Sequence, residues 1–254
     1  MSLGRTPAAS RPAHRNVSLT AGLLYMLTFV SIPTFGLYAS VKSADYVLGS
    51  GPDTSATIGG ILEIIVALAG IGTAVVLFPV LKKQNESAAL GLVAARVLES
   101  GTIFVGVAFL LSIVTLRKSG AGADALATSH ALVALYDRIF LLGQSFMPAV
   151  CDLLLGFLLY KSRLVPRGLS AIGIVGGPVL LAGYLGVLFG LVAQHSTVAG
   201  LSAVPVAVFE FSLGVWLVVK GFDAHAVAVL EAGSGPDGRA PAAADPPAPA
   251  PSLH

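Results

Sequence analysis

Seven ionisable side chains interrupt the apolar stretches of this chain, and they are the residues that could carry chemistry. They are Glu63, Arg96, Glu99, Asp137, Arg138, Asp152 and Glu210. A charge inside a bilayer costs roughly 2.5–3.5 kcal/mol on insertion scales, so each needs a partner or a functional reason. Carboxyl groups that share a desolvated site, with a guanidinium as counter-charge, can bind and release protons or cations. The residue types therefore indicate an ion site, a proton relay or a set of buried ion pairs.

Depth in the membrane separates these residues into two groups. Counted at about 1.5 Å per residue from the basic end of each apolar stretch, four of them lie about 12–17 Å deep, near the midplane. These four are Arg96, Glu99, Asp152 and Glu210. By the same count Glu63, Asp137 and Arg138 fall near the opposite boundary, where we expect solvated or paired interfacial charges.

The four deep residues could form one cluster. Arg96 and Glu99 are spaced i,i+3, which places them on one helical face where they can pair. If Asp152 and Glu210 also turn inward, the cluster contains one cation and three carboxyl groups. Two interpretations stay open. The cluster binds or relays a proton, a small ion or a solute, or it is a structural network that locks the helices together.

Six apolar stretches must position these charges. They cover residues 17–41, 58–81, 88–116, 139–160, 169–193 and 197–219, each long enough to cross a bilayer. With 55% hydrophobic and 11% charged residues, the chain is predicted to be all-α, a polytopic transmembrane helical bundle of six spans. The last two stretches would form a helix of about 63 Å if joined, so we expect a hairpin near Gln194–Thr197 or Gly200.

Basic residues are distributed unequally between the two sides of the predicted bundle. One side carries ten, namely Arg5, Arg11, Arg15, Lys82, Lys83, Lys161, Arg163, Arg167, Lys220 and Arg239; the other carries three, Lys42, Arg117 and Lys118. The positive-inside rule then predicts that both termini are cytoplasmic. Residues 1–16 are expected to be a disordered N-terminus, 17–222 the six-helix domain, and 223–254 a disordered Pro/Ala-rich tail.

The remaining motifs indicate few other functions. The net charge of +2 without a basic run gives no indication of nucleic-acid binding, and neither a cofactor nor a metal site is indicated. There is no nucleophile elbow, zincin motif or P-loop, so enzyme activity is undecided but weakly supported. The fifth span is rich in glycine, and its Gly186-x-x-x-Gly190 motif predicts close helix packing, which could also support an oligomer.

Three segments resemble a known protein family. They read LFPVLKKQNESAALGLVAARVLES (77–100), LLYKSRLVPRGLSAIGIVGG (158–177) and PVAVFEFSLGVWLVVKGF (205–222). Together they resemble the bacterial domain-of-unknown-function 4386 family of integral membrane proteins. The positions that match charged or polar elements of the family pattern are Lys82, Arg96, Glu99, Ser162, Arg163, Pro166 and Glu210, whereas Asp152 does not match one.

The resemblance implies a multi-pass protein of the bacterial inner membrane and no established activity. Combined with the charged cluster, it leaves two functional hypotheses. The first is a small transporter or proton- or ion-coupled permease with a charged midplane site. The second is a structural or regulatory membrane protein whose buried charges only lock the bundle. The basic residues Lys82, Lys161, Arg163 and Arg167 are expected to form a cytoplasmic rim that contacts lipid headgroups.

Overall fold

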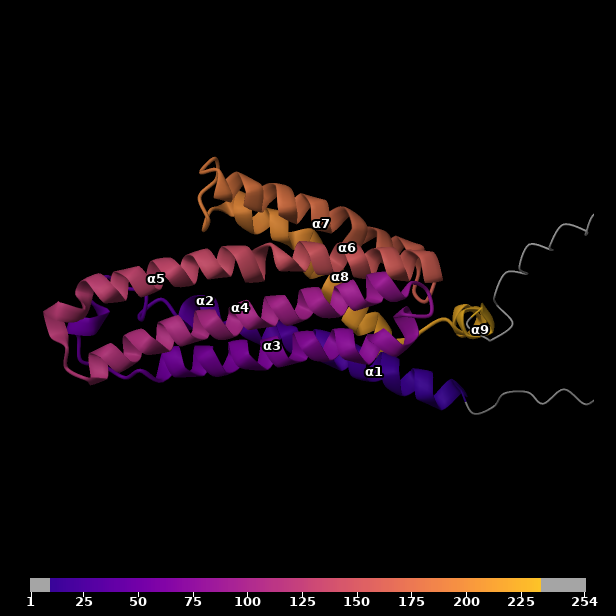
Figure 1. Ribbon diagram of the computed structural model, residues 1–254, viewed down its shortest axis with the longest axis horizontal. Helices are drawn as coiled ribbons and strands as arrows, with labels where there is room; N and C mark the ends of the chain where they lie inside the picture. Colours follow the sequence, from indigo (N-terminus) through magenta and orange to yellow (C-terminus); the bar gives the residue numbers. More distant parts are fainter. Residues whose placement is uncertain (1–9, 234–254) are drawn as a thin grey trace, which may run out of the picture.

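The computed structural model describes residues 10–233, which are mainly helical and contain no strand. Six helical segments are long and apolar enough to cross a membrane: His14–Leu37, Thr54–Leu81, Glu86–Lys118, Gly122–Ser162, Arg167–Leu188 and Thr197–Val219. The six-span, all-α fold predicted from the sequence is therefore confirmed. We call the end of the bundle where Ser10 and Gly233 lie the terminal end, and the opposite end the far end (Figure 1).

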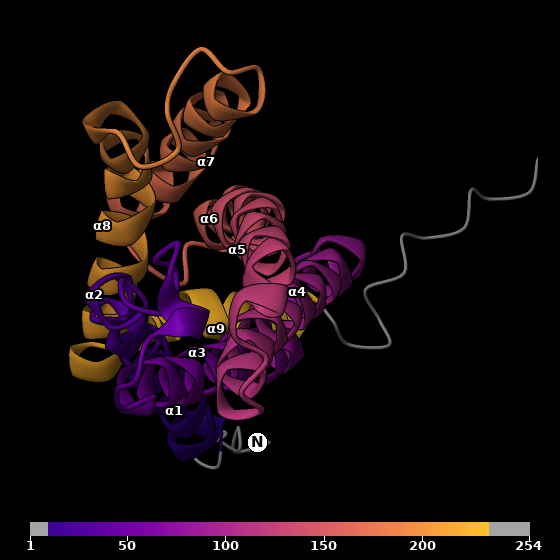
Figure 2. The same cartoon turned by 90° about the vertical axis from the view of Figure 1, so that its left-hand side faces the viewer.

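The spans form a closed ring in chain order. The helices concerned are α1 (Ser10–Thr28), α3 (Thr54–Leu81), α4 (Glu86–Lys118), α6 (Met147–Ser162), α7 (Arg167–Leu188) and α8 (Thr197–Val219). Each packs on the next, and α8 returns to pack on α1 (Figure 2). A residue that faces the centre of this ring is shielded from lipid by its neighbours, so the ring can hold polar groups within the membrane.

The first span is broken near its middle. Helix α1 continues through a short 3-10 turn, Phe29–Ser31, and Pro33 precedes the four-residue helix α2 (Thr34–Leu37). Proline has no backbone N–H and its ring clashes with the preceding turn, which disfavours a regular helix at this point. The expected span at 17–41 is present but is not one straight helix.

The fourth span is longer than expected and contains a π-helical segment. Helix α5 (Leu126–Phe140) leads into the π turn Leu141–Ser145 and then into α6. Pro148 lies in the first turn of α6 and cannot donate a helical hydrogen bond, which accounts for the widened turn before it. Hydropathy alone predicted residues 139–160, because the polar side chains on α5 hid the helical continuation to Gly122.

The far end is held by a polar network between the end of the third span and the loop before the second span. Arg117 donates hydrogen bonds to Asp53 and to the carbonyl of Gly51, and its guanidinium lies 4.0 Å from the ring centroid of Tyr46. The Tyr46 hydroxyl donates to Asp53 at 2.5 Å, and this bond, with Arg117 nearby, lowers the pKa of the Asp53 carboxyl. Burial and the same contact raise the pKa of Tyr46 to about 12.

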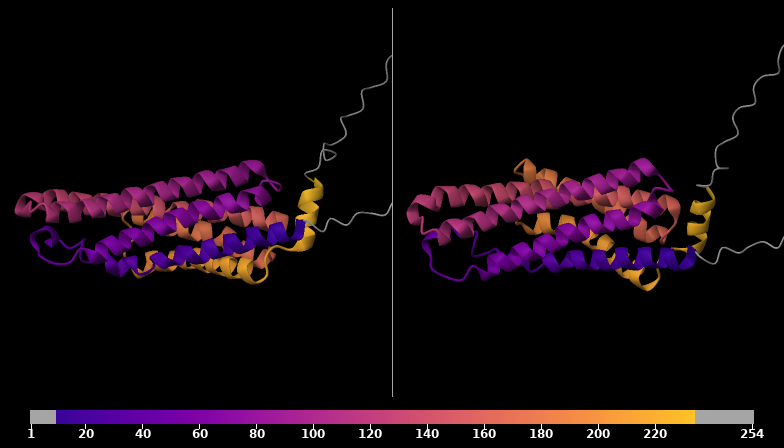
Figure 3. Two further views of the ribbon diagram at one scale, coloured as in Figure 1. Left: turned by 90° about the horizontal axis from the view of Figure 1, so that it is seen from below. Right: turned by 60° about the horizontal axis from the view of Figure 1, so that its bottom comes forward.

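The terminal end contains more helix than the sequence predicted. Residues Ala224–Gly233 form a ten-residue helix, α9, which crosses the end of the bundle (Figure 3). Asp223 caps it by accepting a hydrogen bond from the Ala226 N–H at 2.8 Å, and Ala226 and Val227 are buried against the bundle. Residues 10–16 likewise belong to α1. The rest of both predicted tails, 1–9 and 234–254, lies outside the described residues.

Glycines allow the closest helix contacts in the ring. A Cβ added at Gly22 of α1 would lie 2.7 Å from the carbonyl oxygen of Gly214 on α8, so the two backbones approach directly. On α7, Gly173 faces Phe209 of α8 and Gly177 faces α6. Helix packing through small residues was predicted for the fifth span, and these contacts are of that kind.

The predicted Gly186–Gly190 packing motif is wrong. Helix α7 ends at Leu188, and Gly190 has a φ of 73° in the turn that follows, with no atom within 4 Å of an added Cβ. Gly190 therefore serves the left-handed turn of the α7–α8 hairpin and not a helix interface. An oligomer through this span would have to use a face other than the one packed on α6 and α8, and it stays a prediction.

Candidate functional site

Arg96 joins two carboxylates across the centre of the ring. Its Nη1 donates to Glu99 Oε2 at 3.0 Å on the same helix, as the i,i+3 spacing predicted. Its Nη2 donates to Glu210 Oε1 of α8. The three side chains are at most 14% exposed, so these are buried ion pairs in which charge is compensated within the protein.

Asp152 lies beside this cluster without a hydrogen-bond partner. Its side chain is fully buried on α6, and it interacts electrostatically with Arg96, Glu99 and Glu210. Neither of its carboxyl oxygens has a hydrogen-bond partner among the described residues. The four deep residues named from the sequence therefore converge in space, and Asp152, which did not match the family pattern, belongs with the others.

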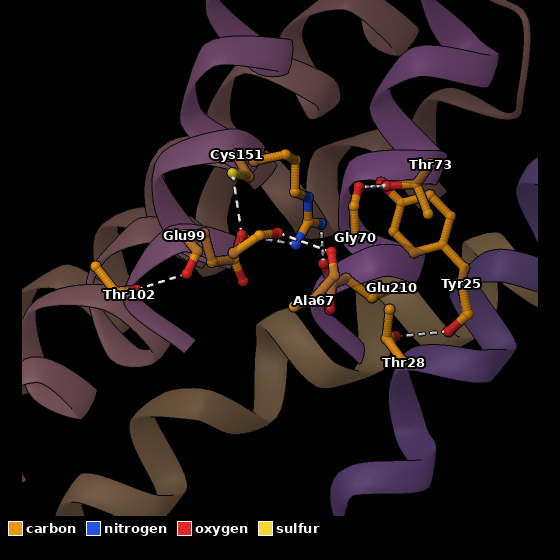
Figure 4. A network of polar contacts seen from close by, with 11 residues as sticks. Tyr25, Thr28, Ala67, Gly70, Thr73, Glu99, Thr102, Cys151 and Glu210 are labelled. Atoms are coloured by element: carbon orange, nitrogen blue, oxygen red, sulfur yellow. Dashed lines mark hydrogen bonds and ion pairs between the residues drawn. The ribbon is translucent and has the colours of Figure 1, made fainter. Parts of the chain in front are cut away.

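Neutral groups surround the charged cluster (Figure 4). The Cys151 thiol is directed at Glu99 Oε2 at 3.6 Å, and the guanidinium of Arg96 lies 5.8 Å from the ring centroid of Tyr25. Ser100 donates to the carbonyl of Ala67 at 2.8 Å, which ties α4 to α3. These contacts hold the cluster in one arrangement between α1, α3, α4, α6 and α8.

A cavity of about 230 Å³, which we call the central cavity, adjoins the cluster. Every span contributes to its wall; the residues that matter most here are Ser31, Gly70, Arg96, Glu99, Gln144, Tyr184, Ala203 and Glu210. On α8 the lining residues run from Glu210 toward the far end. The volume is large enough for several waters or a small solute, and both carboxylates of the ion-pair network border it.

The terminal half of the ring is closed by an apolar core. Tyr25, Leu92, Leu155, Phe209 and Leu213 belong to one cluster of buried side chains there, each at most 1% exposed. This core lies between the charged cluster and the terminal end. The apolar core therefore closes the central cavity toward the terminal end.

Cysteine accessibility provides a direct check of this asymmetry. We expect an Ala203→Cys variant, at the cavity wall, to react with a water-soluble, membrane-impermeant thiol reagent added on the far side. Leu213→Cys, in the apolar core, should not react, and the wild type should be silent because Cys151 is buried. Equal labelling of both variants in intact vesicles would contradict an apolar core that closes the cavity toward the terminal end.

Glu63 is a functional candidate that the sequence analysis placed in the wrong environment. It was expected to be an interfacial charge, yet it is 1% exposed and accepts hydrogen bonds from the hydroxyls of Tyr38 and Tyr136, both at 3.2 Å. A signal for this was present in the sequence. Ala56, Gly60, Glu63, Ala67, Gly70 and Ala74 recur at i,i+3 and i,i+4, and such a stripe of small residues marks the face of a helix that packs on other helices.

The two other boundary charges behave as expected. Asp137 accepts an ion pair from Lys42 at 2.6 Å, and both side chains are about one quarter exposed. Arg138 is exposed. Asp137 lines a cavity at the far end of the ring, and Arg138 follows it on the same helix, α5.

The expected basic rim lies at the terminal end. Lys82, Lys161, Arg163 and Arg167 are all exposed, and none forms an ion pair with another residue in the described part of the chain. Arg163 ends α6 in the left-handed conformation, with a φ of 57°. Lys82 and Arg167 lie over the rings of Phe78 and Tyr160, at 5.6 and 5.0 Å. Free cationic groups next to aromatic rings suit a membrane interface, and lipid binding by this rim stays a prediction.

No possible metal site was found among the His, Cys, Asp and Glu residues of the described chain. Comparison with curated proteins and with solved structures gave no match. Comparison with protein families gave one over residues 20–221, which covers all six spans and contains Arg96, Glu99, Asp152 and Glu210 as well as Glu63. The family is described as a domain of unknown function, DUF4386. The resemblance noted in the sequence is confirmed, and this chain belongs to the DUF4386 family.

Proposed function

We propose that this protein is a small proton- or ion-coupled transporter whose binding site is the central cavity. The observation that supports this most is the position of the Arg96–Glu99–Glu210 network, which borders a cavity of about 230 Å³ formed by all six spans. A network that served only to join helices would gain nothing from an adjoining space that water or solute can fill. Ionisable residues within a membrane typically mark ion or substrate pathways.

The charge of the site favours a proton or another small cation as the coupling ion. Arg96 is the one basic residue that contacts the cluster in the described chain, whereas Glu99, Glu210 and Asp152 supply three carboxyl groups. If all were ionised, the cluster would carry a net charge of −2 in a low dielectric, which is unfavourable. A bound proton or cation would reduce this negative charge, so the site should bind a cation more favourably than it stays empty.

The orientation of the protein and the membrane in which it lies are part of the same proposal. The ten basic residues of the terminal side favour a cytoplasmic location for both termini in the bacterial inner membrane. The central cavity would then be open toward the outside and closed toward the cytoplasm. Transport would require the apolar core around Phe209 and Leu213 to open when the far half closes.

Proton flux into reconstituted vesicles tests the proposal. With a pH-sensitive dye inside and an imposed potassium diffusion potential, the wild type should carry protons. Glu99→Gln or Glu210→Gln should lower the flux to that of protein-free vesicles, because an amide does not titrate at these pH values and cannot carry a proton as a carboxyl group does. Glu86→Gln is the matched control, since Glu86 is an exposed acid in the first turn of the same helix α4. Unchanged flux in both variants, with normal folding, would remove the transport role of these residues.

A structural role is the second candidate, and one contact favours it. Arg96 connects α4 to α8, and these helices are not neighbours in the chain or in the ring. The ion pair across the centre could lock the bundle while the terminal-end loops contact a regulatory partner. This role predicts a loss of stability without a transport defect, and the triple variant in the Discussion separates the two.

A further inference from the structure

Glu63 is a buried acid held by three neutral groups from three different segments. Tyr38 follows α2, Tyr136 lies on α5, and Gln144 lies in the π-helical turn. The two tyrosine hydroxyls each donate to a different carboxylate oxygen, and the Gln144 side chain lies close enough to interact with the same carboxylate. In the described chain no basic side chain forms an ion pair with Glu63, so its charge is not neutralised as those of Glu99 and Glu210 are.

The groups that hold Glu63 line two separate cavities. Tyr38 and Tyr136 line a cavity of about 310 Å³ at the far end, which also borders Lys42 and Asp137 and which we call the far-end cavity. Gln144 lines the central cavity. Glu63 itself lies between them, and Val66 and Gly70, one and two turns further along α3 on the same face, line the central cavity. Residues that contact or interact with Glu63 therefore line each of the two cavities.

The backbone of the fourth span brings Gln144 toward Glu63. Gln144 reaches Glu63 from a π turn, and such turns occur often at functional sites because they redirect a side chain that a regular helix would point elsewhere. Gly143 beside it leaves room for Thr102 of α4, since an added Cβ would overlap the threonine hydroxyl. The fourth span is thus shaped to bring an amide to a carboxylate on α3.

We propose that Glu63 is a proton-binding residue that connects the far-end cavity to the central cavity. The inference rests on the proposed transport function and adds the entry site for its coupling ion. A proton from water in the far-end cavity joins one carboxylate oxygen, and the side chain becomes a neutral acid. The acid then donates this proton to water in the central cavity and returns to a carboxylate, so no other bond changes. Tyrosine hydroxyls can both donate and accept, and they suit both states.

The charged and titratable groups facing Glu63 are consistent with a proton and not with a bound metal cation. They are Tyr38, Tyr136 and Lys42, the last of which is paired with Asp137. The Nζ atom of Lys42 also lies 5.0 Å from the ring centroid of Tyr136, so a positive charge is already present beside the site. A metal cation would need several oxygen ligands in place of the donors that the structure directs at Glu63.

Infrared difference spectroscopy of the reconstituted protein detects protonation of Glu63 without requiring transport. A pH step should produce a carboxylic-acid carbonyl band in the wild type, and Glu63→Gln should remove one component of it while Glu86→Gln leaves the spectrum unchanged. Glutamine keeps the size of the side chain, and the tyrosine hydroxyls can reorient toward it. A wild-type spectrum in which no component depends on Glu63 at any pH at which the protein stays folded would overturn the inference.

Proton flux then tests whether Glu63 lies on the route. Glu63→Gln should reduce flux to the level of protein-free vesicles, and Gln144→Leu should also reduce it while preserving the Glu63 infrared band, because only the link to the central cavity is removed. If Glu99→Gln and Glu210→Gln abolish flux but Glu63→Gln does not, the proposed function stands and this inference fails. If Glu63 titrates but no variant or wild-type protein carries protons, the transport proposal fails, and with it the role of Glu63 as an entry site.

Discussion

Replacement of Arg96 by methionine is expected to lower the free energy of unfolding by about 3–5 kcal/mol, because it leaves the partners of a buried ion pair without compensation. Glu99 and Glu210 would then face each other as buried carboxylates beside Asp152, with no cation on the cluster. Thermal or denaturant unfolding in detergent measures the effect. Arg138→Met is the matched control, because Arg138 is exposed and lies on another span. Arg117→Met would not serve, because Arg117 takes part in the polar network at the far end.

Neutralising the whole network separates structural locking from transport. Arg96→Met combined with Glu99→Gln and Glu210→Gln should recover most of the lost stability, because uncharged groups of similar size can replace a buried ion pair without cost. The transport hypothesis predicts that this stable triple variant carries no protons. If the triple variant is stable and still conducts like the wild type, the charged cluster has only a structural role. If stability is not recovered, the cavity must depend on these charges for its shape.

Substitution of Gly22 should have the second largest effect. Alanine at this position places a Cβ 2.7 Å from the Gly214 carbonyl oxygen and 2.9 Å from the Val218 backbone nitrogen, and backbone atoms cannot rotate away as a side chain can. We expect a loss of about 1–3 kcal/mol for Gly22→Ala and more for Gly22→Val. Helix α8 would also move away from α1 and carry Glu210 with it, so proton flux should fall with stability.

Gly101→Ala is the matched control for this effect. Gly101 lies within α4, and an added Cβ there meets no atom within 4 Å. Alanine should therefore be neutral or slightly stabilising, because it has a higher helix propensity than glycine by about 1 kcal/mol in water. Equal destabilisation by Gly22→Ala and Gly101→Ala would show that the α1–α8 contact does not close the ring.

Local spacing explains which parts of the site could be predicted from the sequence. The pairing of Arg96 with Glu99 follows from their i,i+3 separation on one helix, and the depth of all four midplane residues follows from helical rise. The contact between Arg96 and Glu210 spans 114 positions and depends on α8 returning to α1. That closure is set by Gly22 and Gly214, whose roles appear only when the two helices are side by side.

The features that were missed have a different physical origin. The interfacial assignment of Glu63 came from depth alone, and depth does not show whether lipid, water or protein surrounds a residue. The π turn at Leu141–Ser145 and the ending of α7 before Gly190 are backbone adjustments to Pro148 and to the hairpin, and neither changes the hydropathy of the sequence. Helix α9 is short, so its stability depends on packing against the bundle and on its Asp223 cap.

The unequal lengths of the spans mean that the two sides of the ring meet the bilayer differently. Helices α7 and α8, of 22 and 23 residues, are about 33–35 Å long, which matches a hydrocarbon core of about 30 Å. Helix α4, with 33 residues, and the 41-residue segment Gly122–Ser162 reach about 50–60 Å. Lipids next to α7 and α8 meet a matched wall, whereas the opposite side of the ring must tilt, thicken the local membrane or stand above it. The far end therefore extends further on one side of the ring than on the other. A solute that approaches the central cavity meets short helices on one side and long helices on the other.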